Sequence, residues 1–358
     1  MRKLASVQEI ADIRAIEGAD KIEVATVLGW QVVVAKSENF KVGDKIIYVE
    51  TDSIMPEKPE FEFLRERKFR VKIIKLRKQV SEGLVLPLSI LPDGKYEVGD
   101  DLTQIIGVRK HDPQAEQEAK ETTRQAKNPI IKFLMRFLWF RKFYIKPKKG
   151  GFPAWIVKTD EDRIQVKTAM FKIEKELGTK FSVTEKLDGQ SVTIFLERIR
   201  KNKFEFGVCS RNLRLKQPNN SSWWTIAKQI DAENVLKEML EDVNGHRIVL
   251  QGEIIGTGIQ GNKYKIDGYD FYAFNLIIDG KKLPTEFMQH ALNDYSIKTV
   301  PILDTEFKLL EDIPTMVEYA KGDSVLLKTK REGVVIRSYE RNISFKVISP
   351  DFLLAEKD

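Results

Sequence analysis

The residues best suited to chemistry lie in one short run, 184–189, where a lysine stands close to a carboxylate and a glycine. If this run ends a strand, Lys186 and Asp188 point to the same face, because side chains two positions apart do so. Gly189 then allows a turn that no side chain would block. An amine in this setting becomes a nucleophile only if its pKa falls from about 10.4. Ordinary hairpin ends contain the same residue types, so the meaning of the run depends on what accompanies it.

Four later segments each combine a strand-like pattern with one polar or aromatic residue at a defined place. They are 247–253, 271–275, 331–337 and 344–348. The first ends on Glu253, the second contains Phe274, the third has Glu332 near its start and the fourth carries Lys346. Each segment alone is compatible with a plain core strand. In this order, after a candidate nucleophile, they are hard to explain as unrelated strands.

The ordered set resembles the sequence motifs of the covalent nucleotidyltransferases, which include ATP-dependent RNA and DNA ligases and GTP-dependent RNA capping enzymes. The resemblance implies that Lys186 is the lysine that receives the nucleotide, with Asp188 and Gly189 completing its motif. It further implies that Arg211 contacts the phosphate and ribose side of the nucleotide and that Phe274 stacks on the purine. Stacking suits adenine and guanine equally, so ATP and GTP both remain open on this ground.

The same resemblance covers about residues 151–355 and identifies Glu253 and Glu332 as motif acids and Lys346 as a motif V lysine. Mg²⁺ keeps several waters and is held by a few carboxylates. Asp188, Glu253 and Glu332 are therefore the predicted set for Mg²⁺ or Mn²⁺, acting through water. With three scattered histidines and one cysteine, the chain shows no zinc or histidine-base site.

One departure from the family concerns motif V. The family usually has two lysines separated by one residue, whereas Lys346 is flanked at that spacing by Ser344 and Ile348. The clamp on the nucleotide phosphate is therefore predicted to be shared with Arg337 or Arg211.

Residues 1–107 differ from the rest and predict a small OB-type barrel. Five short candidate strands, separated by turns, lie at 21–29, 30–36, 45–50, 70–77 and 83–90. The basic stretch 65–72 suits either a strand that follows a phosphate backbone or a solvated surface. The predicted fold class is α+β, with this barrel followed by a nucleotidyltransferase domain at 151–358, built of ATP-grasp-like antiparallel sheets with flanking helices.

Residues 108–150 form a basic and apolar linker, in which 130–143 is expected to be a helix. That helix could lie on a membrane surface, bind a partner or pack on the catalytic domain; packing is favoured, since glycines and a proline follow. Next, 158–165 resembles the polar segment before motif I of RNA ligases, which makes Lys158 and Arg163 candidate triphosphate contacts.

Composition is consistent with a nucleic-acid partner, because the net charge is +7 and the isoelectric point is near 9.1. The single cysteine excludes an internal disulfide framework, and no signal peptide or run of about 20 apolar residues is present. We therefore expect a soluble, cytoplasmic monomer with no stable membrane association.

Domain order favours one branch of the superfamily. DNA ligases and capping enzymes carry an OB domain after motif V, whereas only 12 residues (358 − 346) follow Lys346 here. The chain thus resembles nick-sealing ATP-dependent RNA ligases with an N-terminal OB domain, which implies RNA or an RNA-containing nicked duplex as substrate. The alternatives are a GTP-dependent capping-type enzyme and a non-catalytic tRNA- or RNA-binding protein. Since all matched motifs follow residue 151, the nucleotide pocket is expected to lie entirely in the C-terminal domain.

Overall fold

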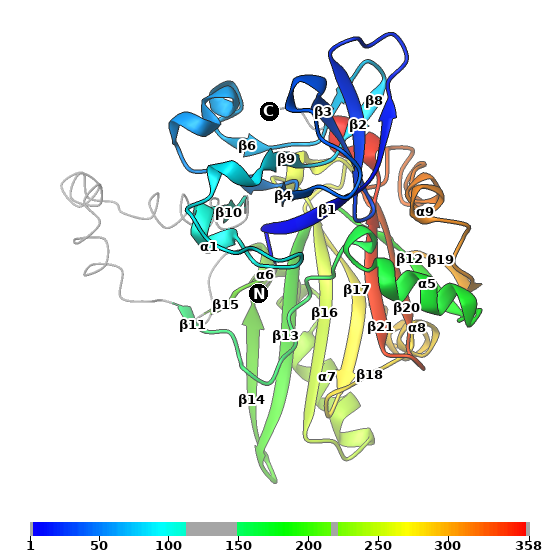
Figure 1. Cartoon of the computed structure of the whole chain (residues 1–358). Coiled ribbons are helices and arrows are strands. Elements are labelled where there is room, and N and C mark those ends of the chain that lie inside the picture. The colour runs from blue at the N-terminus through cyan, green and yellow to red at the C-terminus, as the bar shows by residue number, and fades with distance from the viewer. Residues whose placement is uncertain (1–2, 112–148, 216–220, 356–358) are drawn as a thin grey trace, which may run out of the picture.

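The computed structural model describes residues 3–111, 149–215 and 221–355, which form an N-terminal barrel and a larger part built on two sheets (Figure 1). The barrel is chiefly a five-stranded antiparallel sheet in the order β3-β2-β1-β4-β9. Its strands are β1 (Ala5–Ala15), β2 (Ile22–Val27), β3 (Trp30–Ala35), β4 (Lys45–Val49) and β9 (Leu84–Pro87). Their apolar side chains fill the interior, where Trp30 stacks on Tyr48. The predicted OB-type barrel is confirmed.

Strand β1 was missed by the sequence pattern, although it is the central strand of the barrel. It pairs with β4 through residues 5–9 and with β2 through residues 10–15, with an irregularity after Ile10. Most of its buried positions lie in its first half, and its second half is largely exposed. Because that half carries Asp12 and Arg14 rather than a clear apolar alternation, the strand has no strong period-2 signal.

The predicted strand at 70–77 was wrong, because the structure divides it between two small sheets. Strand β6 (Arg70–Val71) joins β5 (Ser53–Ile54) and β10 (Arg109–Lys110), whereas β7 (Ile74–Leu76) forms a hairpin with β8 (Gln79–Ser81). The basic stretch 65–72 likewise begins in a 3-10 helix, η2, rather than in a strand. The barrel's helices are η1 (Lys36–Glu38), η2 (Pro59–Arg67), η3 (Leu88–Ile90) and α1 (Thr103–Ile106).

A seven-stranded antiparallel sheet is the larger sheet of the C-terminal part, in the order β11-β15-β14-β13-β16-β17-β18. Its strands are β11 (Lys149–Gly151), β13 (Gln190–Arg200), β14 (Lys203–Cys209), β15 (Leu213–Leu215), β16 (Arg247–Gly256), β17 (Tyr269–Ile278) and β18 (Lys281–Lys282). Helices α6 (Ser222–Gln229), α7 (Ala232–Asp242) and α8 (Thr285–Asn293) pack their apolar side chains against it and form the largest core.

A four-stranded sheet, β19-β12-β20-β21, faces the first and brings together distant parts of the chain. Its strands are β12 (Phe181–Lys186), β19 (Ile302–Phe307), β20 (Gly333–Ser338) and β21 (Ile343–Ile348). The remaining helices of this part are η4 (Ile164–Val166), α5 (Thr168–Glu176), η5 (Gln260–Asn262), α9 (Ile313–Tyr319) and α10 (Pro350–Ala355). The motif segments predicted as strands are confirmed as β12, β16, β17, β20 and β21, and the α+β fold class is confirmed.

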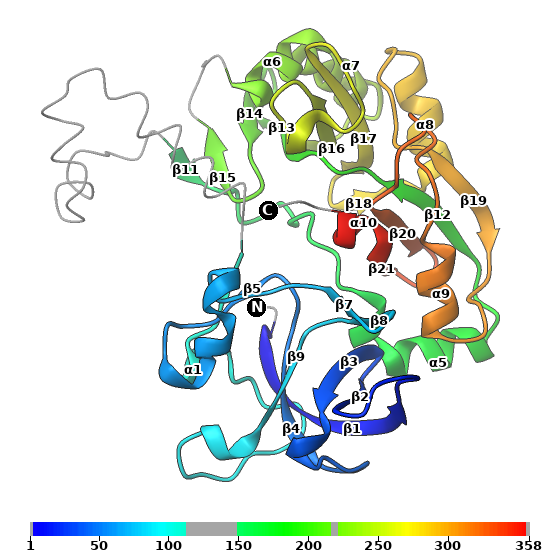
Figure 2. The ribbon, with the colours of Figure 1, turned by 90° about the horizontal axis from the view of Figure 1, so that it is seen from above.

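The barrel packs closely on the C-terminal part at the residues around η4 (Figure 2). The N–H of Gly29 donates to the carbonyl of Gln165 at 3.0 Å, and a Cβ at Gly29 would come within 2.9 Å of the Gln165 Cα. The Arg163 guanidinium lies over the Trp30 ring and pairs with Asp52 of the barrel. Glycine at position 29 is thus needed for the close contact between the two parts.

The predicted helix at 130–143 lies outside the described residues. Within those residues, the helices are all too short or too polar to span a bilayer.

Candidate active site

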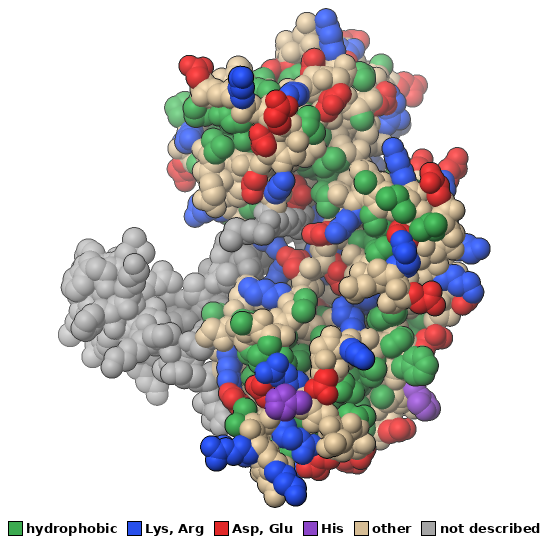
Figure 3. All heavy atoms as spheres, turned by 60° about the horizontal axis from the view of Figure 1, so that its bottom comes forward, with side chains coloured by type: hydrophobic (Ala, Val, Ile, Leu, Met, Phe, Trp, Pro, Cys, Tyr) green, Lys and Arg blue, Asp and Glu red, His purple; other side chains and the backbone are tan. Residues whose placement is uncertain are grey.

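A cavity of about 270 Å³ opens where the barrel meets the two C-terminal sheets. The molecular surface is hollowed there, and both acidic and basic side chains lie around the hollow (Figure 3). The lining includes all the residues singled out from the sequence except Lys158; these are Arg163, Lys186, Asp188, Gly189, Arg211, Glu253, Phe274, Glu332, Arg337 and Lys346. Segments that are up to about 180 residues apart in the chain therefore form a single site.

Strand pairing places Lys186 beside Glu332. Lys186 is the last residue of β12 and pairs with Gly333, the first residue of β20, so Glu332 lies next to it. Gly333 has a φ of 156°, and a Cβ there would lie 2.2 Å from the Val347 carbonyl oxygen on β21. A glycine is therefore required for β20 to begin at this point.

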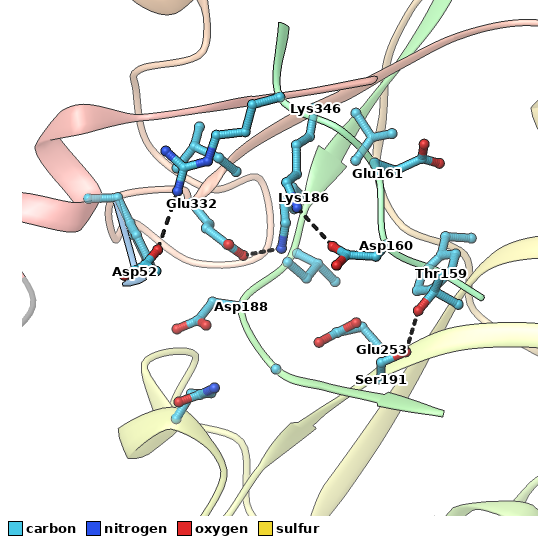
Figure 4. Close-up of a pocket in the computed structure, with 18 of the residues that line it drawn as sticks. Asp52, Thr159, Asp160, Glu161, Lys186, Asp188, Ser191, Glu253, Glu332 and Lys346 are labelled. Atoms are coloured by element: carbon cyan, nitrogen blue, oxygen red, sulfur yellow. Dashed lines mark hydrogen bonds and ion pairs between the residues drawn. The ribbon is translucent and has the colours of Figure 1, made fainter. Parts of the chain in front are cut away.

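A second glycine brings the nucleophile turn close to β16. A Cβ at Gly189 would lie 2.4 Å from the Ile254 carbonyl oxygen and 2.8 Å from the Glu253 Cγ. Any other residue would push the turn away from that strand. Gly189 thus has a steric reason to be glycine, and its place beside Glu253 keeps Asp188 and Glu253 in the same pocket (Figure 4).

The Lys186 amine is surrounded by carboxylates. Its Nζ lies 2.6 Å from the Glu332 Oε2, and Glu253 and Asp188 line the same cavity (Figure 4). Burial lowers the pKa of Lys186, but Glu332, Glu253 and Asp188 outweigh burial and raise this pKa above its ordinary value. The protein's own side chains therefore favour the charged amine. A neutral amine requires a cation that offsets these carboxylates.

The three carboxylates fit a hydrated divalent cation. Burial raises the pKa of Glu253 to about 8 and that of Asp188 to about 6, so negative charge at this place is unfavourable without a nearby cation. Lys263 supplies part of the compensating positive charge through an ion pair with Asp188 at 2.6 Å. Among the described residues, no group of three acidic, histidine or cysteine side chains is close enough to ligate one ion directly. Carboxylate oxygens that are too widely spaced to ligate one ion directly suit Mg²⁺ bound through its waters.

Asp160, which the sequence did not single out, forms ion pairs with three basic side chains. Its carboxylate lies 2.8 Å from Lys110 of β10, 2.9 Å from Arg211 and 3.1 Å from Lys346 of β21. Burial raises the pKa of Asp160, but Lys346, Arg211 and Lys110 outweigh burial and hold this pKa far below its usual range. Two of these cations are the ones predicted to bind nucleotide phosphate. The cluster therefore marks the position where the site concentrates positive charge.

The backbone explains how Asp160 reaches β21. The N–H of Lys346 donates to the carbonyl of Asp162 at 2.8 Å, and Arg163 forms a parallel bridge with Lys346. The segment that precedes η4 therefore runs beside the motif V strand. The polar segment 158–165 before motif I was a usable signal for this site. The sequence analysis took Lys158 and Arg163 from it as candidate contacts and did not consider Asp160.

Three of the predicted cations have protein partners of their own. Arg163 is 6% exposed and pairs with Asp52 at 3.3 Å, so it joins the barrel to the site. Arg337 is also buried and pairs with Glu161 at 3.5 Å. Lys158 donates to Asn212 at 3.4 Å and is the one predicted contact outside the cavity lining. Their roles toward phosphate stay predictions.

The barrel forms one wall of the cavity, which the sequence did not indicate. Its contributions are Leu4, Thr51, Asp52, Arg70, Lys110 and His111. The nucleotide pocket was expected to lie entirely in the C-terminal domain, whereas the cavity around the motif residues extends onto the barrel. Of these side chains, only Arg70 lies in a stretch that the sequence singled out, because they become neighbours of the site only through the packing of the two parts.

Comparisons with known proteins agree with this site. An OB-fold domain family matches residues 4–88, and the RNA ligase family matches residues 179–348. No curated protein matches the sequence. Among solved structures, a mutant of the Naegleria gruberi RNA ligase with ATP and Mn is 32% identical and has a TM-score of 0.81, with 100% of both chains covered. The same ligase with PPi is 33% identical and has a TM-score of 0.79, with 99% of this chain and 98% of that one covered.

A further mutant of that ligase, with AMP and Mn, is 32% identical over 100% of both chains, with a TM-score of 0.80. Identity at this level over the whole length, together with the two family matches, goes well beyond a shared fold. The chain belongs to the RNA ligase family, and carries an N-terminal OB-fold domain in front of the ligase region.

Proposed function

We propose that this RNA ligase uses ATP to join RNA 3′-OH and 5′-phosphate ends through a lysyl-AMP intermediate, with nicks in duplexes as its substrate. The observation that carries the proposal is the position of Lys186, whose amine lies among three carboxylates in a cavity that Arg211 and Lys346 also line. The Naegleria structures with ATP, AMP, PPi and Mn support ATP and a divalent metal as the cofactors.

In the first step, the Lys186 Nζ would attack the α-phosphorus of ATP, form a phosphorus–nitrogen bond and release pyrophosphate. A hydrated Mg²⁺ or Mn²⁺ held by Asp188, Glu253 and Glu332 would lower the pKa of the amine and offset charge on the phosphate. AMP would then pass to the RNA 5′-phosphate, and attack by the 3′-OH would release AMP and form the phosphodiester. Each step transfers a phosphoryl group, so positioning and fixed charge supply most of the catalysis.

Other residues of the pocket would hold the nucleotide. Phe274 is partly buried in an apolar cluster and lines the cavity, where its ring could stack on the purine. Arg211 and Lys346 already converge on one carboxylate, so a phosphate group could bind to the same pair. Arg337 and Arg163 also line the cavity and would contribute to its positive potential.

The substrate is proposed to bind along the OB-fold barrel, because the barrel forms one wall of the cavity and this fold commonly binds single strands. A 5′-phosphate in the cavity would then be held between the two parts of the molecule. We further propose that the protein acts as a monomer.

Incubation with α-labelled ATP or GTP and Mg²⁺, followed by denaturing electrophoresis, tests the function. We expect a label that survives denaturation with ATP and not with GTP, because the proposed nucleotide is ATP. The labelled protein should then transfer its AMP to a nicked RNA duplex and seal it. A label from GTP would indicate a capping-type enzyme, and no label from either nucleotide would leave a binding protein.

Lys346→Ala should slow lysine adenylylation by about tenfold and should also slow sealing. A hydrogen bond to a charged group contributes about 1.5 kcal/mol or more, and 1.4 kcal/mol is a tenfold change in rate. The loss should stay moderate, since Arg211 and Lys110 bind the same carboxylate as Lys346 and remain in place. Single-turnover labelling with ATP measures the first step separately from sealing.

Ile348→Lys tests which motif V lysine is missing. Ile348 lines the cavity and shares a strand face with Lys346, because the two residues are two positions apart in β21. A faster first step in this variant would assign the missing lysine to position 348. An unchanged Lys346→Ala protein would instead show that the remaining cations suffice.

A further inference from the structure

The β7–β8 hairpin has an unusual turn. Leu76 pairs with Gln79, which leaves Arg77 and Lys78 as a two-residue loop. Their φ values are 48° and 69°, so both residues adopt the left-handed conformation of a type I′ turn. This turn favours Asn-Gly, because residues with long side chains are strained at positive φ. Strain of this kind often accompanies a functional role, and here it presents two cations at the tip of a hairpin.

The cations of this hairpin differ from Arg65 and Arg70 of the basic stretch 65–72. Lys75, Arg77 and Lys78 are exposed, and none of them forms an ion pair with another described residue. By contrast, Arg65 pairs with Glu62 and Arg70 pairs with Asp52, so their charge is partly neutralised within the barrel. Arg67 and Lys68 are also exposed, at the end of η2. The β7–β8 hairpin therefore adds three exposed cations to the positive charge that the barrel offers to a ligand.

The hairpin is held firmly and lies near the cavity. The Gln79 side chain donates to Gln31 of β3 at 2.7 Å, and the Ser81 hydroxyl accepts the Val33 N–H at 2.9 Å. Arg70, which lines the cavity, precedes β7 by four residues. Seen from above, β7 and β8 lie at the edge of the barrel that faces β21 and α10 (Figure 2). A ligand that extends from the cavity along this edge would meet the hairpin.

We propose that the β7–β8 hairpin binds the phosphodiester backbone of the nucleic acid next to the strand break, through Lys75, Arg77 and Lys78. This inference rests on the proposed function, because that function places a polyanion at the adjacent cavity. Backbone phosphates are held mainly by such cations, whose contacts fix register without reading sequence. The hairpin then keeps the broken strand aligned while the chemistry takes place at Lys186.

The turn itself offers a test that separates charge from folding. The double variant Arg77→Asn with Lys78→Gly removes both charges and installs the dipeptide that a type I′ turn prefers, so the hairpin should remain folded. The matched control is Lys201→Gln with Lys203→Gln at the β13–β14 turn, which removes two exposed charges at the far end of the seven-stranded sheet (Figure 1).

Affinity for a nicked RNA duplex, measured by fluorescence anisotropy at several salt concentrations, is the main readout. The turn variant should bind about tenfold or more weakly than the control, and the slope of log affinity against log salt should be shallower by about one for each lost contact. Labelling of Lys186 by ATP without RNA should be unchanged, because the hairpin does not line the cavity. Lys75→Glu on β7 should weaken binding in the same way without touching the turn.

The proposal would be overturned if the turn variant and Lys75→Glu had the same affinity and salt slope as the control. The charge of the hairpin would then be assigned to solubility alone. That result would leave ATP labelling and sealing intact in the parent protein. Failure of the proposed function would look different, since the parent protein itself would neither take label from ATP nor join ends.

Discussion

Replacing Lys186 with alanine should abolish the labelled adduct and reduce end joining below detection. The amine is the only proposed nucleophile. Among the described residues, the other lysines that line the cavity are Lys110 and Lys346, and both are paired with Asp160. Lys186→Arg should not restore activity, because guanidinium stays protonated and cannot attack phosphorus. Denaturing electrophoresis with α-labelled ATP measures the adduct directly.

Two further measurements complete this test. A nicked duplex that already carries AMP on its 5′-phosphate bypasses the lysine, so Lys186→Ala should still join it. In the wild type, adduct formation should accelerate as the pH rises, since the neighbouring carboxylates raise the pKa of Lys186 and only the neutral amine reacts. A labelled adduct in Lys186→Ala would place the nucleophile elsewhere.

Glu253→Ala and Glu332→Ala should each slow adduct formation by a factor on the order of 10² or more. Glu332 is the direct partner of the Lys186 amine at 2.6 Å, and Glu253 lies in the same cavity with a pKa raised by burial to about 8. Removing either one disturbs the set that would hold a hydrated metal. Single-turnover labelling across a range of Mg²⁺ concentrations measures both the rate and the metal dependence.

Glu205→Ala is a suitable control, because Glu205 of β14 pairs with Arg214 of β15 and does not line the cavity. That protein should label at the wild-type rate. The two active-site variants should also need more Mg²⁺ to reach half of their own maximum rate. Wild-type rates in Glu253→Ala or Glu332→Ala would contradict the assignment of that residue.

The sequence predicted the motif strands and ten of the residues that line the cavity, because each of these leaves a local pattern. Such patterns span only a few residues. They are a lysine at a strand end, an acid beside the start of an apolar strand, and glycines at close contacts. Lys186, Glu332 and Lys346 could be found in this way. Their partners across the sheet could not, because register and packing decide them.

The parts that the sequence missed depend on contacts between the two halves of the molecule. Asp160 looks like one acid in a polar segment until Lys110 and Lys346 are placed around it. Strand β1 lacks apolar alternation in the half that is exposed. The charge around Lys186 also depends on packing, since the sequence shows which acids exist and not how closely they surround the amine.

The pairing of β12 with β20 has a consequence for biosynthesis. Lys186 and its partner Glu332 are separated by 146 positions, and the β21 strand that carries Lys346 is added later still. A ribosome therefore completes the barrel, the seven-stranded sheet and the nucleophile strand before it produces β19 and β20, the two strands that pair with β12. Contacts between distant segments form slowly and late. The growing chain can acquire a folded barrel early, but it cannot assemble the nucleotide site until β20 and β21 have left the ribosome, so a ligase stalled in translation would lack activity.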